Sequence, residues 1–188
     1  MEFYKVLEKR KSIREFEKKN IPQSLLIKLV KAATKAASAA NSQPWRFYIV
    51  QGKKRDKLSE ILRERWKKLD FKGYNPGLKK VLQKMGIDMC EAPCIILIYL
   101  KKVKNFPDMA SVHSTDLAAA NLMNAAVAEG LGTCWINHFK IEEKKVNKAL
   151  NIPKDEVLVA PLIIGYPKKG YKPLIREKKK LKEILFWR

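Results

Sequence analysis

The feature that most limits how this chain folds is a long stretch, residues 105–139, that contains no lysine or arginine. Cations are abundant elsewhere, because the 188 residues include 40 lysines and arginines against 19 acidic residues, for a formal net charge of +21. Charged side chains normally cover solvated faces, so a segment without cations in such a chain is shielded from water. We therefore expect residues 105–139 to be buried in the core of the domain or against a partner subunit.

Length and composition predict one soluble domain over residues 1–188. The chain is long enough for one hydrophobic core, and its 46% apolar and 31% charged residues favour a folded protein. No run reaches the roughly 18 apolar residues of a membrane span, and the first residues lack the order of a signal peptide. The three cysteines form no Cys-x-x-Cys pair, which argues against a disulfide scaffold or structural zinc. We expect a cytoplasmic protein.

Apolar spacing predicts a mixture of helices and strands. Helical periods occur at 2–9, 20–38, 53–68, 78–85, 114–129 and 142–150. Short runs rich in β-branched and aromatic residues predict strands at 45–51, 95–100, 133–136 and 157–164. Capping residues suggest the helix ends: Asn20 with Pro22 begins the second helix, Gly86 ends the fourth in a left-handed cap, and Ser114-Thr115-Asp116 begins the fifth.

A cluster of cations follows the first predicted helix. Arg10, Lys11 and Arg14 surround the hydroxyl of Ser12, and this set of donors suits a phosphate group held by charge-assisted hydrogen bonds. A solvated basic turn is the alternative. Farther along, small residues from Ser38 precede Asn41, Gln43 and Pro44-Trp45, so a flat ligand can approach the backbone beside two amide side chains. An ordinary loop between helix and strand would use similar residues.

The order of these residues resembles the nitroreductase family of flavin-dependent oxidoreductases. The resemblance rests on Arg10-Lys11-Ser12-Ile13-Arg14-Glu15-Phe16 and on Ala37-Ser38-Ala39-Ala40-Asn41-Ser42-Gln43-Pro44-Trp45. Gly130-Leu131-Gly132-Thr133-Cys134-Trp135-Ile136 is similar to the family's turn into the strand beside the flavin, and Ile164-Gly165-Tyr166-Pro167 to its last core strand. The resemblance spans nearly the whole chain.

The resemblance implies an α+β, three-layer α/β/α fold, with a central, mostly antiparallel sheet flanked by helices, in an intertwined homodimer that binds FMN at its interface. It also implies an NAD(P)H-dependent oxidoreductase that passes a hydride through the flavin to a nitroaromatic, a quinone or a similar small acceptor, in a ping-pong cycle without a catalytic side chain. A flavin-binding relative with another activity is the alternative, because one fold hosts several functions.

The resemblance further implies which residues hold FMN. The phosphate, ribityl and pyrimidine groups would meet a set of N-terminal and C-terminal residues: Arg10, Lys11, Ser12, Arg14, Arg176 and Lys178. Residues from the partner subunit would approach the ring: Ser38, Ala39, Asn41 and Gln43. The ring edge, with an N–H for N5, would be lined by Trp135, Ile136 and Asn137.

Three parts of the sequence remain open at this point. His138, beside Asn137 where the family usually has small residues, is either a proton donor or a structural residue. Flavin contacts around Met85 to Asp88 are unassigned. Trp66, Phe71 and Tyr74 form either a lid over the acceptor or aromatic anchors of an exposed loop.

A nucleic-acid-binding protein is a rival interpretation of the high charge. The basic residues are spread over 1–50, 51–104 and 140–188, and no RNA-binding or DNA-binding motif is visible. Lysine-rich surfaces also occur in proteins from hot environments. The pattern therefore argues against nucleic acid as the partner, and it gives no sign of a membrane partner.

Overall fold

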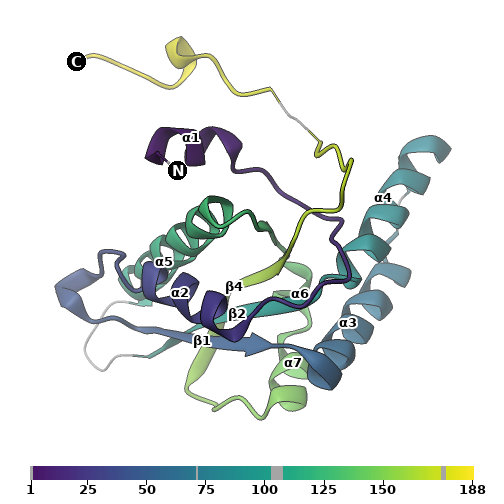
Figure 1. The fold of residues 1–188 in the computed structure, drawn as a ribbon, viewed down its shortest axis with the longest axis horizontal. Helices are drawn as coiled ribbons and strands as arrows, with labels where there is room; N and C mark the ends of the chain where they lie inside the picture. The colour runs from purple at the N-terminus through teal and green to yellow at the C-terminus, as the bar shows by residue number, and fades with distance from the viewer. Residues whose placement is uncertain (1, 71, 103–107, 175–176) are drawn as a thin grey trace.

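A four-stranded antiparallel sheet forms the middle of the molecule (Figure 1). The structure, a computed structural model, describes residues 2–70, 72–102, 108–174 and 177–188. Its strands are β1 (Trp45–Val50), β2 (Cys94–Lys101), β3 (Gly132–Trp135) and β4 (Glu156–Gly165), in the order β1-β2-β4-β3. Its helices are α1 (Phe3–Lys9), α2 (Gln23–Ala33), α3 (Gly52–Lys67), α4 (Pro76–Cys90), α5 (Asp108–Ala128), α6 (His138–Ile141) and α7 (Glu143–Leu150), with 3-10 turns η1 (Ala39–Asn41) and η2 (Leu181–Glu183).

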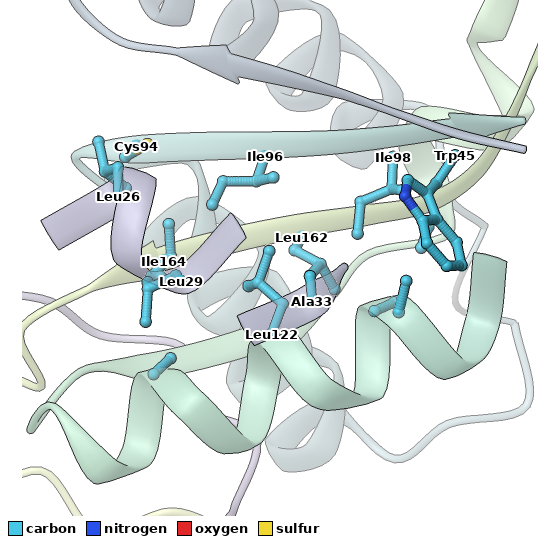
Figure 2. Close-up of a cluster of buried hydrophobic side chains, with 14 of the residues drawn as sticks. Leu26, Leu29, Ala33, Trp45, Cys94, Ile96, Ile98, Leu122, Leu162 and Ile164 are labelled. Atoms are coloured by element: carbon cyan, nitrogen blue, oxygen red, sulfur yellow. The ribbon is translucent and has the colours of Figure 1, made fainter. Parts of the chain in front are cut away.

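One face of the sheet packs against α2 and α5. Alternate residues of β2 point to this face, and Ile96 and Ile98 meet Leu122 of α5 and Leu29 of α2 there (Figure 2). The side chains are fully or almost fully buried. The inner side of α5 is therefore core, as the lack of cations in residues 105–139 predicts for the part that the structure describes.

The other face of the sheet packs against α3, α6 and α7. The odd-numbered residues of β2, such as Leu97, meet Leu58 of α3 and Phe139 of α6. A strand covered on both faces must be apolar on both, which explains the unbroken apolar run of β2. The three layers confirm the predicted α+β fold. No helix among the described residues is long and apolar enough to cross a membrane.

Four predicted helix ends are wrong, and the first is the start of α5. Residues 114–116 do not begin α5, because the helix already runs from Asp108. The hydroxyls of Ser114 and Thr115 instead donate to the carbonyls four residues earlier, at Ala110 and Ser111 (2.7 and 2.8 Å). Short hydroxyl side chains make such bonds within a helix as readily as they cap one, so the local sequence did not distinguish the two.

Gly86 does not end α4. The helix continues to Cys90. Gly86 lies against the ring of Trp66, and an added Cβ there would overlap the indole. The second helix is also shorter than predicted: Pro22, not Asn20, precedes its first turn, and it ends at Ala33.

Candidate functional site

The predicted phosphate clamp lies along the edge of the sheet beside β3. Ser12 forms a parallel bridge with Thr133, and the Ile13 N–H donates to the Thr133 carbonyl (2.9 Å). Gly132 makes this approach possible, because a Cβ there would lie 2.5 Å from Ile13 Cγ1. The clamp is thereby fixed next to the strand that leads to the predicted ring-edge residues.

The cations of this clamp surround the buried thiol of Cys134. Burial raises the pKa of Cys134, while the positive charges of Arg14 and Arg10 oppose that rise. Arg14 is partly buried and donates to the Ser12 carbonyl (3.2 Å), whereas Lys11 is exposed. The site therefore has its positive potential where β3 begins, which suits an anionic group.

The ring-edge residues follow β3 directly. Ile136 is buried and donates its N–H to the Pro161 carbonyl (2.8 Å), while the indole N–H of Trp135 donates to Asn137 Oδ1 (2.9 Å). In the part of the chain that the structure describes, the backbone N–H of Asn137 has no acceptor. An N–H left over at the start of α6 is a ready donor for a ligand.

The loop of residues 38–43 has a strained backbone. Ala40, Asn41 and Gln43 have φ angles of 47°, 53° and 42°. Each non-glycine residue in this left-handed region costs roughly 1–2 kcal/mol, and such strain gathers at ligand sites. Two serines support the loop: Ser38 Oγ accepts from the Gln43 N–H, and Ser114 Oγ of α5 accepts from the Ala39 N–H, both at 3.2 Å.

This loop lies at the opposite corner of the sheet from the clamp. It leads into Trp45, which pairs with Leu100 of β2, whereas Thr133 beside the clamp pairs with Ile164, which pairs with Cys94 at the other end of β2. Six residue steps along β2 separate the two ends by about 20 Å. Figure 1 shows the loop and the clamp at opposite ends of the molecule. The structure thus brings residues 10–14 and 135–137 together and keeps residues 38–43 of the same chain away from them.

The C-terminal tail does not pack on its own domain. Arg176 lies outside the described residues; Lys178 is exposed, and the apolar side chains that follow it are exposed too, with 70% of Phe186 and 89% of Trp187 accessible. The tail passes above α1 (Figure 1), whose Phe3 and Tyr4 are also exposed. A docking site for the tail therefore has to come from another molecule.

The sequence leaves the contribution of α4 to this site unassigned. A cavity of about 180 Å³ adjoins Arg14, and one of its walls is the α4 side with Val81, Lys84, Met85 and Asp88. Lys84 bridges Asp88 (2.6 Å) and Glu15 (3.6 Å), which ties α4 to the residue after Arg14. The unassigned stretch from Met85 to Asp88 therefore does face the clamp, although the charge-rich helix pattern gave no sign of it.

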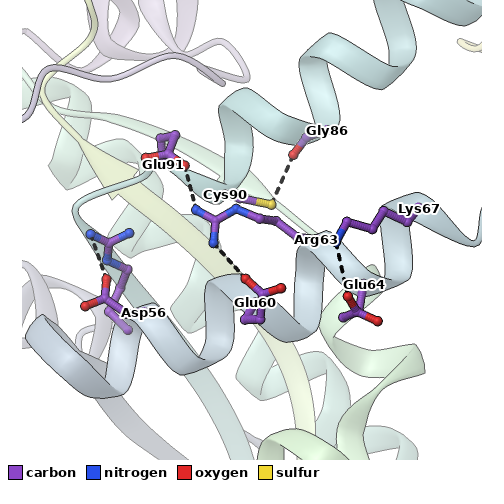
Figure 3. Close-up of polar contacts among 9 residues, drawn as sticks. Asp56, Glu60, Arg63, Glu64, Lys67, Gly86, Cys90 and Glu91 are labelled. Atoms are coloured by element: carbon purple, nitrogen blue, oxygen red, sulfur yellow. Dashed lines mark hydrogen bonds and ion pairs between the residues drawn. The ribbon is translucent and has the colours of Figure 1, made fainter.

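Helices α3 and α4 are joined to each other by polar contacts. Arg63 of α3 bonds Glu60 (3.1 Å) and Glu91 (2.6 Å), and the buried thiol of Cys90 donates to the Gly86 carbonyl (3.2 Å; Figure 3). Burial raises the pKa of Cys90 to about 12, so this thiol is not a nucleophile at neutral pH. The described residues contain no group of three side chains able to hold a metal ion.

Comparison with known proteins gives the same family as the sequence motifs. The model of the nitroreductase family matches residues 7–166. An iodotyrosine deiodinase of Thermotoga neapolitana is 31% identical over 169 residues, which cover 87% of this chain and 88% of that protein. A nitroreductase family protein from Clostridium novyi NT has a TM-score of 0.70 at 29% identity, covering 90% of this chain and 87% of the other. The FMN-dependent nitroreductase NfnB from Mycobacterium smegmatis, in complex with NADPH, has a TM-score of 0.80 at 18% identity, covering 98% and 97%, and at that identity shows the fold alone.

Proposed function

Because the chain belongs to the nitroreductase family, we propose that it is an FMN-dependent oxidoreductase that transfers a hydride from NADH or NADPH to a small acceptor. The observation that supports this proposal is the bridge between Ser12 and Thr133, which joins the cationic clamp to the strand that leads to Asn137. The Asn137 N–H has no acceptor among the described residues. An anion-binding group and a candidate donor for the ring edge thus lie along the same strand and the turn that follows it. A phosphate-bearing flat cofactor needs both.

The residues fit FMN in charge and in shape. Arg10 and Lys11 neutralise the phosphate, the Ser12 hydroxyl donates to it, and Arg176 and Lys178 supply further cations from the tail. Arg14 lies on the pyrimidine side, where its charge stabilises negative charge at N1 and O2. Trp135 and Ile136 hold the turn, so that the Asn137 N–H donates to N5. When bound, FMN supplies the redox chemistry by taking a hydride from the nicotinamide and passing it to the acceptor.

The site is complete only in a homodimer. Ser38, Ala39, Asn41 and Gln43 lie at the far corner of the sheet in their own chain, so they reach a flavin held by a partner's clamp rather than by their own. The exposed outer side of α5 and the apolar tail offer the surfaces for this pairing, because large exposed apolar patches mark interaction sites. The strained loop is then already shaped to meet the partner's flavin ring.

The proposal is tested by reconstitution with FMN. We expect the purified wild-type protein to be yellow and to sediment as a dimer. The Arg10→Ala variant should bind FMN more weakly by roughly 10-fold to 100-fold, because a charge-assisted hydrogen bond contributes about 1.5–3 kcal/mol. Arg46→Ala is the matched control, since Arg46 is exposed and bonds only the neighbouring Trp45 carbonyl in the described residues. A colourless monomer that gains no flavin, or equal FMN affinity in the two variants, contradicts the proposal.

The acceptor is identified with a panel of substrates. Nitroaromatics and quinones come first, because both accept a hydride from a reduced flavin. Halogenated tyrosines join them, because the 31% identical relative from Thermotoga neapolitana is an iodotyrosine deiodinase. Steady-state rates with each acceptor and each nicotinamide give the preference, and parallel lines in double-reciprocal plots are expected for the ping-pong cycle.

A further inference from the structure

His138 holds a position that the proposed function leaves without a role. It is the first residue of α6 and follows the ring-edge residue Asn137 directly. Its imidazole packs against the indole of Trp66 from α3, with 4.7 Å between ring centroids and an angle of 59° between the planes. Among the described residues, its buried Nδ1 has no hydrogen-bond partner. A purely structural histidine normally has its ring nitrogens satisfied.

Trp66 is itself held by a close contact with α4. Because Gly86 has no side chain, the helix backbone reaches the ring, and any Cβ there would overlap the indole. Arg63, one turn before Trp66 on α3, ties the same helix pair together by bonding Glu60 on α3 and Glu91 after α4 (Figure 3). The imidazole therefore rests on a wall that is supported by two helices, and its orientation is set by Trp66.

The charges around His138 favour release of a proton. Burial lowers the pKa of His138 below its ordinary value, and the positive charge of Arg65 on α3 lowers it further. On its own helix, the carboxylate of Glu142 one turn later is paired with Lys145 (2.7 Å) and offers the imidazole little compensation. An imidazolium in these surroundings is a stronger acid than a free one.

We propose that His138 donates the proton that must accompany hydride transfer to the acceptor, and that Trp66 is the positioning residue that holds its imidazole. This inference rests on the proposed function. For a nitro group, R–NO2 takes a hydride from the reduced flavin and one proton from His138, one N–O bond breaks, and the products are R–NO and water. His138 is left neutral and is reprotonated from solvent.

The test compares an acceptor that needs no proton with one that does. Ferricyanide takes electrons alone, whereas a nitroaromatic needs the proton as well. In FMN-loaded His138→Gln, we expect reoxidation of the flavin by the nitroaromatic to slow by about 100-fold, within the range of general acid catalysis, and reoxidation by ferricyanide to keep its rate. The wild-type rate with the nitroaromatic should rise as the pH falls toward the pKa of His138, and the variant should lose this dependence.

Two substitutions test the role of Trp66, one that keeps an aromatic ring and one that removes it. Trp66→Phe keeps an aromatic face and should retain most of the nitroaromatic rate, whereas Trp66→Leu should lose much of it and shift the pH profile toward that of His138→Gln. Lys57→Ala is the matched control, because Lys57 is exposed on α3 more than two helical turns before Trp66, and it should change neither acceptor rate. His113→Gln, at the other histidine of the chain, is used only to assign the NMR signals.

A readout without turnover comes from proton NMR of the imidazole rings. With two histidines, each signal is assigned by its loss in one of the glutamine variants. The His138 signal should carry an indole ring-current shift that Trp66→Leu removes, and it should move when FMN is added. Equal slowing with both acceptors, an unchanged pH profile in His138→Gln, or a signal insensitive to FMN overturns the inference. Failure of FMN to bind at all overturns the proposed function instead.

Discussion

The two faces of the sheet are covered by helices that present opposite surfaces to the outside. Toward the sheet both are apolar, with Leu122 of α5 on one face and Leu58 of α3 on the other, each fully buried. On the outer side, α3 carries ion pairs such as Arg63 with Glu60, whereas the outer side of α5 carries Met109 and Leu117, which are 67% and 50% exposed. The outer side of α3 is therefore a polar surface suited to water, whereas the outer side of α5 leaves apolar side chains exposed.

This contrast indicates which surface the proposed second subunit would cover. A monomeric protein rarely leaves large apolar side chains of one helix exposed together, and α1 and the tail add further apolar side chains near those of α5. The lack of cations in residues 105–139 therefore has two causes: burial against the sheet on the inner side of α5 and, we infer, burial against a partner on the outer side.

The largest expected effect tests the inner sides of the two helices. Leu122→Ala should lower the free energy of unfolding by about 2–5 kcal/mol, because it leaves a cavity in a close-packed core. Leu58→Ala on the opposite face is the matched variant and should cost a similar amount, measured by urea denaturation at low protein concentration. If either costs less than about 1 kcal/mol, the corresponding face is not a packed core.

The next effect concerns the outer side of α5. Leu117→Asp should weaken dimerisation by roughly 2–4 kcal/mol, because a carboxylate would be buried without a partner, while the fold of the chain stays intact. FMN affinity should fall with it, since each site needs residues from both chains. Ile87→Asp is the control, because Ile87 is comparably exposed, at 57%, but lies on α4. Sedimentation that shows the two variants equally dimeric refutes the assignment of this surface.

A smaller effect tests how α4 is attached to α3. Gly86→Ala should destabilise the protein by about 1–3 kcal/mol, because the new Cβ would overlap Trp66 and force the helices apart. Gly77→Ala, in the first turn of the same helix, adds a Cβ whose nearest contact is 3.4 Å away and should be neutral or stabilise by up to about 1 kcal/mol. Thermal melts of both variants measure the difference, and equal melting temperatures would show that the contact is dispensable.

The sequence predicts the strands better than it predicts the helix ends. Apolar runs at 95–100 and 157–164 gave strands within one residue of β2 and β4, because burial on both faces leaves a continuous pattern. Gly86 lies inside α4 because it contacts the distant ring of Trp66, which no local pattern contains. Ser114 donates to the Ala110 carbonyl one turn earlier, and its residue type alone does not distinguish this bond from a helix cap.

The candidate site is only partly readable from the sequence for the same reason. Arg10 and Arg14 are visible as a cationic cluster, and their place beside Asn137 follows from one parallel bridge that no local pattern reveals. The distance between residues 38–43 and this cluster depends on the strand order β1-β2-β4-β3, so the argument for a second chain could be made only from the folded structure. From the sequence, Lys84 cannot be distinguished from the other lysines of an exposed helix, because its ion pair with Glu15 forms only in the folded structure.

The smallest effect tests the α3 side of the sheet by its response to alkali. The phenol of Tyr48 donates to Glu156 there (2.7 Å), and burial, that hydrogen bond and the carboxylate charge raise its pKa to about 12. A raised pKa means that the folded state favours the neutral phenol, so this stabilisation is complete below the ordinary value near pH 10 and is lost as the pH rises to about 12. We expect Tyr48→Phe to be about 1 kcal/mol less stable than wild type at pH 8, with the gap closing between pH 10 and pH 12, because the other titrating groups are common to both proteins and cancel. Tyr4→Phe, which alters a 78% exposed phenol, should show no gap at either pH; a wild-type advantage over Tyr48→Phe that persists at pH 12 would show that the phenol stabilises this face by packing alone.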